Sequence, residues 1–304
     1  MATMKNLSMA PIGRYIDPLT DFGFKRIFGS EPHKDLLIAF LNALFNGRKV
    51  IRDLVYNPQE SDGPAKHYRK TIFDLTCKGM EGETFIIEMQ RADQRFFTDR
   101  AIFYAASKLY AQGPKGNKHW SFELKEVYFI GLIDFKVNHT RPEKYLHYAR
   151  LVDEETGEAF YKKLEFIFLE LPNFNLEEET LKTDLEYWMY ALKNMAKLEK
   201  IPVTLCQKTF QQLFKIAEVA NLKKEEYMLY QKAVLDKWTE YSVLKTAEEK
   251  GLEMGLEKGA EQKSYEVVYN LLSATDFDIA KIAALAGVTE PFVKKIKASL
   301  KEKK

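Results

Sequence analysis

The chain has 304 residues, of which 46% are hydrophobic and 13% are aromatic, so it can bury a sizeable core and global disorder is excluded. Its formal net charge of +2 gives no general attraction to a polyanion, so a nucleic-acid surface must come from local clustering of charge. The only cysteines, Cys77 and Cys206, are too few for a disulfide framework or a thiolate zinc site.

The N-terminal segment has none of the features of a targeting sequence. We expect residues 1–14 to be a flexible leader, because they contain no long apolar run and no signal-peptide pattern. No other stretch approaches the roughly 18 apolar residues that a membrane span needs. The sequence therefore predicts a soluble, cytoplasmic protein with no membrane partner.

The first half of the chain predicts alternating helices and strands. A loop leads into a short helix over residues 17–29, and a second helix over 32–45 repeats its leucines and phenylalanines at helical spacing. Two β-rich segments, 71–78 and 84–90, flank the turn GMEGE and predict a hairpin. The further elements are a helix over 96–111 and strands over 126–136, 145–152 and 164–171.

The character of the chain changes after Pro172, where we place a domain boundary. Residues 173–272 are charged and helical in almost every window, and residues 273–304 predict a helix-turn-helix-like segment with its turn at Gly287. Gly251, Gly255 and Gly259 recur on one helix face, where a partner helix could approach closely. A weak helix or linker is an equal alternative for this stretch.

Two carboxylates stand inside apolar strands and indicate chemistry. In a hairpin centred on Glu81, Asp74 and Glu88 are directly opposed and point to the same face, and Gln90 shares that face. Carboxylates this close repel unless a cation lies between them, and Mg²⁺ is bound by such pairs together with water and phosphate. The alternatives are an edge hairpin with solvent-facing acids, or a register slip that separates them.

Several short segments occur in one order along the chain: DFGFKRIFG from Asp21, then Glu60, RKTIFDL, FIIEMQ, SKLY and GLIDF. Together they resemble the Rpn, transposase-associated branch of the PD-(D/E)XK nuclease superfamily. The C-terminal EEKG…MGLEKG and DIAKIAALAGVTEPFVKKIK segments are similar to the tail of the same family.

The resemblance implies an acid at Asp74 and a second acid at Glu88, followed by Gln90 where many members carry Lys. Glu60 matches an additional acid of such sites, or is an exposed loop residue. The implied catalytic set is Asp74, Glu88, Gln90 and Glu60. The implied ligands of Mg²⁺ (or Mn²⁺) are Asp74, Glu88 and the carbonyl of Met89.

Several basic and aromatic residues are candidates for contact with nucleic acid. Arg100, Tyr104 and Lys108 share one face of the helix that follows the hairpin, where they could meet phosphates or form a solvated helix side. Lys25 lies four residues after Asp21, so the two could form a surface ion pair or, by the resemblance, border the site.

The sequence thus predicts an α/β protein: a restriction-endonuclease-like core over residues 15–172, with a mixed central sheet flanked by helices, and then a helical C-terminal region. The expected function is a metal-dependent DNA endonuclease linked to recombination or mobile elements. DNA and a second copy of the chain, joined through the C-terminal helices, are the expected partners. The alternative is a catalytically weakened nuclease fold that binds DNA or protein.

Overall fold

The computed structural model describes residues 12–57, 60–61, 71–72, 74–92, 95–114, 120–137 and 143–301. They form two compact units, one ending at Leu235 and the other beginning at Asp236. The first unit is an α/β domain, and the second is entirely helical in its described part. The described residues contain no helix that combines the length and the apolar composition needed to cross a membrane.

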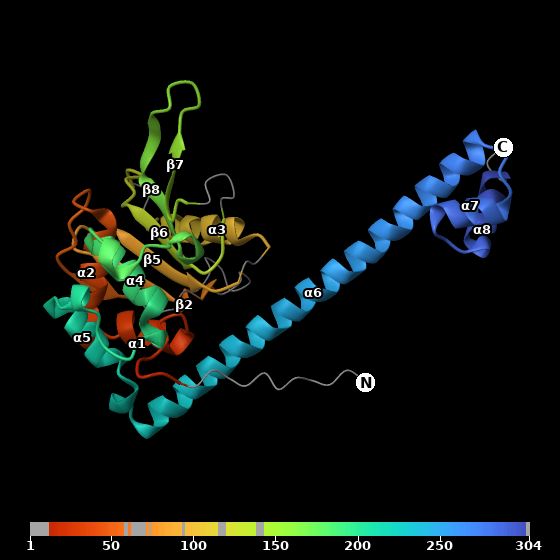
Figure 1. Cartoon of the computed structure of the whole chain (residues 1–304). Coiled ribbons are helices and arrows are strands. Elements are labelled where there is room, and N and C mark those ends of the chain that lie inside the picture. The colour runs from red at the N-terminus through yellow and green to blue at the C-terminus, as the bar shows by residue number, and fades with distance from the viewer. Residues whose placement is uncertain are drawn as a thin grey trace. The chain divides into compact units, whose positions relative to one another are not determined.

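A mixed sheet of six strands forms the centre of the first unit (Figure 1). Its spatial order is β1-β4-β5-β6-β8-β7; β5, β6 and β8 run parallel, and the other neighbours are antiparallel. The strands are β1 (Leu54–Tyr56), β4 (Leu75–Gly79), β5 (Thr84–Gln90), β6 (Val127–Ile133), β7 (Leu146–Val152) and β8 (Ala159–Glu170). A separate two-stranded sheet pairs β2 (Glu60–Ser61) with β3 (Thr71–Ile72).

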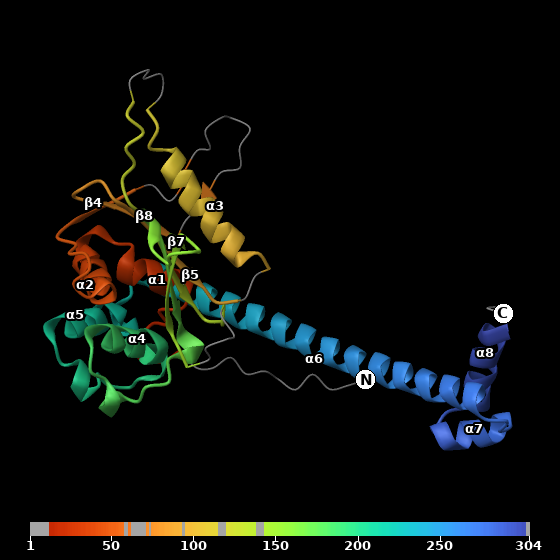
Figure 2. The same ribbon diagram turned by 90° about the horizontal axis from the view of Figure 1, so that it is seen from above.

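The sheet is covered on both faces, which explains the apolar sequence of its central strands. Every residue of β6 is buried, as expected for a strand between two parallel neighbours with helices above and below. Figure 2 shows α3 (Phe97–Tyr110) on one face and the other helices of this unit on the opposite face. Those helices are α1 (Asp21–Phe28), α2 (Lys34–Phe45), α4 (Asp184–Asn194) and α5 (Lys208–Ala217).

Aromatic packing joins the four-helix face to the segment beyond Pro172. The Trp188 ring of α4 contacts Phe28 of α1, Phe40 of α2 and Phe210 of α5, with centroid separations of 5.8, 5.7 and 5.1 Å. The amide of Ile16 also donates to the carbonyl of Ala217 at 2.7 Å. Residues from 173 to 235 therefore belong to the same compact unit as the sheet, although the sequence changes character at Pro172.

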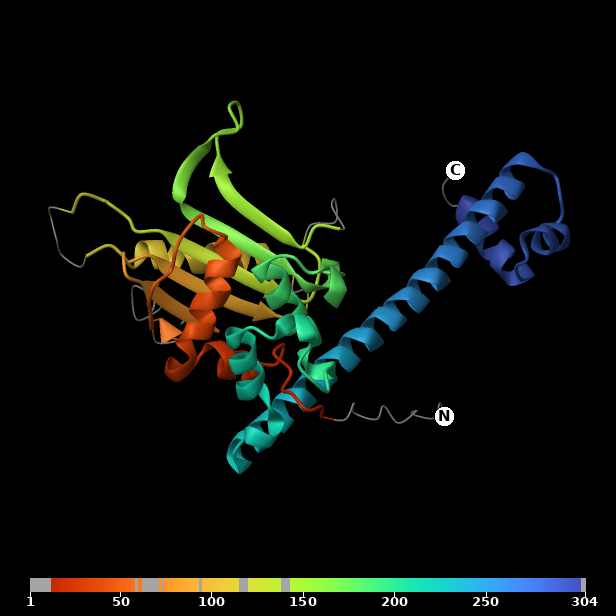
Figure 3. The same cartoon turned by 60° about the vertical axis from the view of Figure 1, so that its left-hand side comes forward.

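Short helices and one hairpin complete the first unit. Figure 3 shows β7 and β8 continuing as a hairpin beyond the edge of the sheet, and their ladder changes register on either side of Leu151. The 3-10 helices are η1 (Glu31–His33), η2 (Leu171–Asn173), η3 (Glu178–Thr180), η4 (Met195–Lys197), η5 (Val203–Leu205) and η6 (Val219–Asn221).

The second unit consists of most of α6 (Lys224–Ala274), followed by α7 (Ile279–Ala286) and α8 (Glu290–Lys301). The two last helices flank Gly287, which ends α7 in the left-handed conformation with φ 66°. A small core of Val268, Ile282, Ala283, Val293 and Ile296 joins them to the end of α6. Gly251, Gly255 and Gly259 lie within α6, and a Cβ built on any of them would contact nothing within 4 Å.

The structure confirms the predicted fold class: a mixed six-stranded sheet flanked by helices, followed by a helical C-terminal region. It corrects one predicted element. The strand predicted over residues 71–78 is two strands, because β3 pairs with β2 in a separate sheet and β4 begins only at Leu75. Asp74 therefore lies immediately before a strand and not within one.

Candidate active site

The hairpin of β4 and β5 places the two strand acids together. Leu75 pairs with Ile87 and Cys77 with Phe85, so Asp74 lies opposite Glu88 at the end of the ladder. The amide of Asp74 donates to Oε1 of Glu88 at 3.3 Å, and the amide of Met89 donates to Oδ2 of Asp74 at 2.8 Å. The register predicted from a turn at Glu81 is confirmed, and no slip separates the acids.

Both acids face the layer that contains α3. Glu88 lies two positions after Ile86 on β5, so the two side chains project to the same face of the sheet. Ile86 packs with Phe97 and Ala101 of α3. Glu88 is only 6% exposed and Asp74 is half-buried. The solvent-facing alternative therefore does not hold for Glu88.

Burial makes it costly for this pair to be fully ionised. It raises the pKa of Glu88 to about 8, with repulsion from Asp74 as the next cause. Burial likewise raises the pKa of Asp74, while the charges of Lys25 and Arg100 act in the opposite direction on both acids. At neutral pH the Glu88 carboxyl of this pair therefore retains its proton unless additional positive charge is brought to it.

Gln90 connects the acids to α3. Its Oε1 accepts a hydrogen bond from an Arg100 guanidinium nitrogen at 2.6 Å, and its Nε2 donates to the carbonyl of Ala92 at 3.1 Å. Its backbone carbonyl accepts from the amide of Asp134, just beyond β6, at 2.9 Å. The neutral amide at position 90 thus holds a cation next to the carboxylates. This contact was not predicted, because it depends on the packing of α3 onto β5.

The structure gathers most of the predicted cationic and aromatic residues around the acids. Burial raises the pKa of Tyr104, and the charge of nearby Glu88 is the second cause of this shift. Lys25 forms an ion pair of 2.6 Å with Asp21, as expected for their spacing on α1, and its charge also reaches the acids.

Two predicted residues are not brought into this group. Lys108 lies close to Lys78. Burial is the main cause that lowers the pKa of Lys108, and the charge of Lys78 is the second. Glu60 has its backbone in β2, paired with Ile72, and its side chain is outside the described residues. Neither the additional acid nor the exposed-loop interpretation of Glu60 is therefore tested.

The donors in this site suit a hard divalent cation that keeps several waters. Among the described residues, no group of three or more His, Cys, Asp or Glu side chains could hold a metal ion. The carbonyl of Gln90 faces β6, so the Met89 carbonyl points to the opposite edge, where the Met89 amide meets Asp74. Two carboxylates and one carbonyl leave coordination positions for water and phosphate, as Mg²⁺ prefers.

The family model described as PD-(D/E)XK nuclease family transposase matches residues 18–247. The chain belongs to this family. The matched range includes the Asp74–Glu88 hairpin, α3 and the helices that pack on the opposite face of the sheet. No curated protein and no solved structure matches the chain. As a PD-(D/E)XK protein it has a nuclease-like domain, and the roles of its individual residues are proposals.

The raised pKa of Glu88 predicts how stability depends on pH without metal. Between the ordinary value of 4.5 and about 8, the folded chain retains a proton that the unfolded chain has released. The free energy of unfolding should therefore fall as pH rises through this window. In EDTA, the melting temperature of the wild type should drop between pH 5 and pH 8, relative to that of Glu88→Gln.

The exposed Glu154→Gln is a matched control and should follow the wild type. Addition of Mg²⁺ at pH 8 should raise the melting temperature of the wild type more than that of Glu88→Gln, because a bound ion stabilises the folded state. Parallel pH profiles for wild type and Glu88→Gln would contradict the assignment of a buried, protonated pair.

Proposed function

We propose that this protein is a metal-dependent DNA endonuclease that hydrolyses phosphodiester bonds and acts in recombination or in mobile-element movement. The observation that carries the proposal is the pair formed by half-buried Asp74 and buried Glu88, with 3.3 Å between the Asp74 amide and the Glu88 carboxylate. Burying two adjacent carboxylates destabilises a fold unless a cation offsets the repulsion. The family to which the chain belongs supports a nuclease-like activity.

Mg²⁺ or Mn²⁺, when bound, would supply an activated water and neutralise charge on the phosphate. Asp74, Glu88 and the Met89 carbonyl would hold the ion. The Met89 amide fixes the orientation of the Asp74 carboxylate by donating to Oδ2. Glu60 would act as a further ligand or orient the attacking water.

Gln90 and Arg100 would act as one unit. Lysine at position 90 would stabilise charge near the attacking water, and glutamine supplies no charge of its own. Here Gln90 accepts a hydrogen bond from Arg100 at 2.6 Å, so the cation comes from α3. Tyr104, Lys25 and Lys108 would contact phosphates of the DNA on either side of the bond that is cleaved.

The second candidate is a weakened nuclease that binds DNA or protein. It is favoured by the neutral residue at position 90 and by the basic C-terminal helix α8. This candidate would bind DNA without cleaving it in either Mg²⁺ or Mn²⁺. The presence of both acids, Asp74 and Glu88, favours the nuclease instead.

The proposed ligands can be tested with isosteric changes. Asp74→Asn and Glu88→Gln keep an oxygen to accept the neighbouring amide and remove one charged metal ligand each. Each should reduce the rate of plasmid cleavage in Mg²⁺ by roughly 100-fold or more, given that tenfold corresponds to about 1.4 kcal/mol of transition-state stabilisation. The measurement is the initial rate of conversion of supercoiled to nicked or linear DNA.

Glu81→Gln is the control, because its carboxylate lies on the turn of the same hairpin and its side chain is 84% exposed. It should cleave like the wild type. Circular dichroism should first establish that all three variants are folded. Wild-type rates in folded Asp74→Asn and Glu88→Gln would falsify the site assignment.

The cation next to Gln90 predicts a non-additive pair of changes. Gln90→Lys alone should lower the cleavage rate by about tenfold, because the new ammonium faces the Arg100 guanidinium and loses its hydrogen bond. Arg100→Gln alone should lower it by a similar factor. The double variant restores one cation and one amide and should be faster than either single variant, measured as kcat/KM on a short duplex. Additive losses in the double variant would show that the two residues act separately.

The C-terminal unit is proposed to set DNA affinity and self-association. Lys294, Lys295 and Lys297 are exposed on α8, whose Val293 and Ile296 are buried. The glycines of α6 leave open helix surface that a second copy of the chain could approach. Both roles are independent of the chemistry proposed for the Asp74–Glu88 pair.

Changing the three lysines to glutamine in the full chain tests the first role. The slope of log affinity against log salt should become shallower by about two to three, since each lost phosphate contact contributes about 0.9. Cleavage at saturating DNA should be unchanged.

A chain ending at Lys245 should show the same loss of affinity and a lower oligomeric state by light scattering. A monomeric full chain and an unchanged salt slope would remove both roles from this unit.

A further inference from the structure

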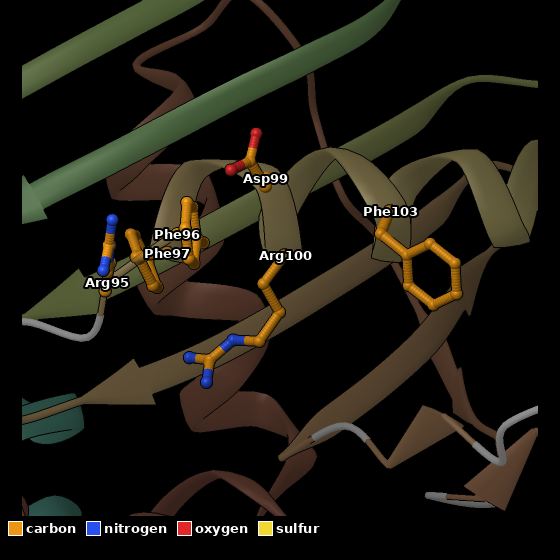
Figure 4. A pocket seen from close by; sticks show the side chains of 6 residues that line it. All are labelled: Arg95, Phe96, Phe97, Asp99, Arg100 and Phe103. Atoms are coloured by element: carbon orange, nitrogen blue, oxygen red, sulfur yellow. The ribbon is translucent and has the colours of Figure 1, made fainter.

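A small pocket opens at the start of α3, beside the proposed active site (Figure 4). Its volume is about 330 Å³, at the lower end of the roughly 300–1,000 Å³ that is usual for ligand pockets. The lining residues are Arg95, Phe96, Phe97, Asp99, Arg100 and Phe103. Three aromatic residues, two arginines and one aspartate therefore line the same pocket.

Two of these rings are exposed without a role in the core. Phe96 is 63% exposed and Phe103 is 57% exposed, and they lie two helical turns apart on the outer side of α3. Phe97, by contrast, is 5% exposed and packs against Phe129, Phe135 and Phe168. The hydrophobic core explains Phe97 and leaves Phe96 and Phe103 unexplained.

The backbone at Phe96 makes this exposure more informative. Phe96 has φ 69° and ψ 26°, in the left-handed region that a phenylalanine rarely adopts. No side-chain hydrogen bond caps the helix at this residue. An unfavourable conformation that presents an apolar ring to solvent gives the folded chain no stability, which points to a functional reason for it.

Arginines link the rings to the active site. The Arg95 guanidinium lies over the Phe96 ring, 5.0 Å from its centroid. Arg100 lies 5.4 Å from the Phe97 centroid and donates to Gln90, two residues beyond Glu88. Figure 4 shows the Arg100 side chain extending from α3 toward the sheet, while the Phe103 ring projects from the next turn of the helix. A ligand in the pocket would therefore share Arg100 with the carboxylate pair.

We infer that this pocket binds an unpaired nucleobase of the DNA strand that is cleaved, so that the preferred substrate contains single-stranded DNA, such as a flap, a strand end or an open loop. This inference rests on the proposed nuclease function and specifies its substrate. Exposed aromatic rings next to arginines are the means by which proteins hold single strands, since each base can stack on a ring while cations meet the phosphates. Asp99 offers an acceptor for the N–H groups of a base.

An intact duplex would not fill the pocket. A base that enters a cavity of this size must leave its stacked and paired position, which costs least where the strand is already single. The alternative occupant is an apolar segment of another protein. The Arg95 guanidinium over the Phe96 ring and the bond from Arg100 to Gln90 favour the base, because they supply positive charge that an apolar segment does not need.

The test compares single-stranded and duplex binding by the full-length protein in EDTA, where cleavage is prevented. The probes are a fluorescent 12-nucleotide strand and the same strand in a duplex, followed by anisotropy. Phe103→Ala should weaken single-strand binding by about 5- to 100-fold and duplex binding by less than about twofold. Phe103→Leu keeps an apolar side chain in the helix but removes the ring, and should lose nearly as much. Phe103→Trp should bind the single strand at least as well as the wild type.

Phe160→Ala is the matched control, because Phe160 is 80% exposed on β8 and lies outside the pocket. It should bind both probes like the wild type. Three results would overturn the inference: single-strand affinity unchanged in Phe103→Ala, wild-type affinity in Phe103→Leu, or equal losses for single strand and duplex. The last would indicate a general DNA surface, and the second a purely apolar contact.

The proposed function can fail separately from this inference. Asp74→Asn should keep the single-strand affinity in EDTA and its sensitivity to Phe103→Ala, while it loses cleavage in Mg²⁺. If Asp74→Asn cleaves like the wild type, the active-site assignment fails and the binding data on the pocket are unaffected.

Discussion

Repulsion between the buried carboxylate of Glu88 and the half-buried carboxylate of Asp74 is the constraint on which the rest of the site depends. The hairpin register leaves Asp74 and Glu88 no freedom to separate, because each accepts an amide from the other strand. The fold therefore keeps together two carboxylates whose charged forms would be more stable in water. The charges of Lys25 on α1 and Arg100 on α3 partly offset this cost. In the proposed mechanism, a divalent ion supplies the positive charge that this site lacks.

Local sequence patterns predicted the elements near this pair well. Strand β5 spans the predicted residues 84–90, and the opposed acids follow from the symmetry of a hairpin about its turn. Such patterns are local, because alternation and turn residues are properties of a few consecutive positions. The break between β3 and β4 was missed because β-formers predominate over residues 71–78, and only the pairing of β3 with β2 shows where one sheet ends.

Contacts between distant segments could not be predicted in the same way. The resemblance placed Gln90 where many family members carry lysine, but its bond to Arg100 arises from the packing of α3 on the sheet. The boundary placed at Pro172 reflects a real change from strands to helices. Trp188 nevertheless packs on Phe28 and Phe40, so the helices that follow complete the same unit. The composition of a segment predicts its secondary structure, but it does not determine which surface of the protein that segment packs against.

The way in which α1 is held has a consequence during synthesis of the chain. Lys25 acts on the acids from α1, near the start of the sequence. Helix α1 is itself held by Trp188 of α4, and Ile16, just before α1, donates to Ala217 at the end of α5. The hairpin can form as soon as it leaves the ribosome, whereas these long-range contacts must wait for residues made much later. A nascent chain therefore carries both carboxylates well before it can assemble their surroundings, which delays completion of the candidate site until the first unit is nearly complete.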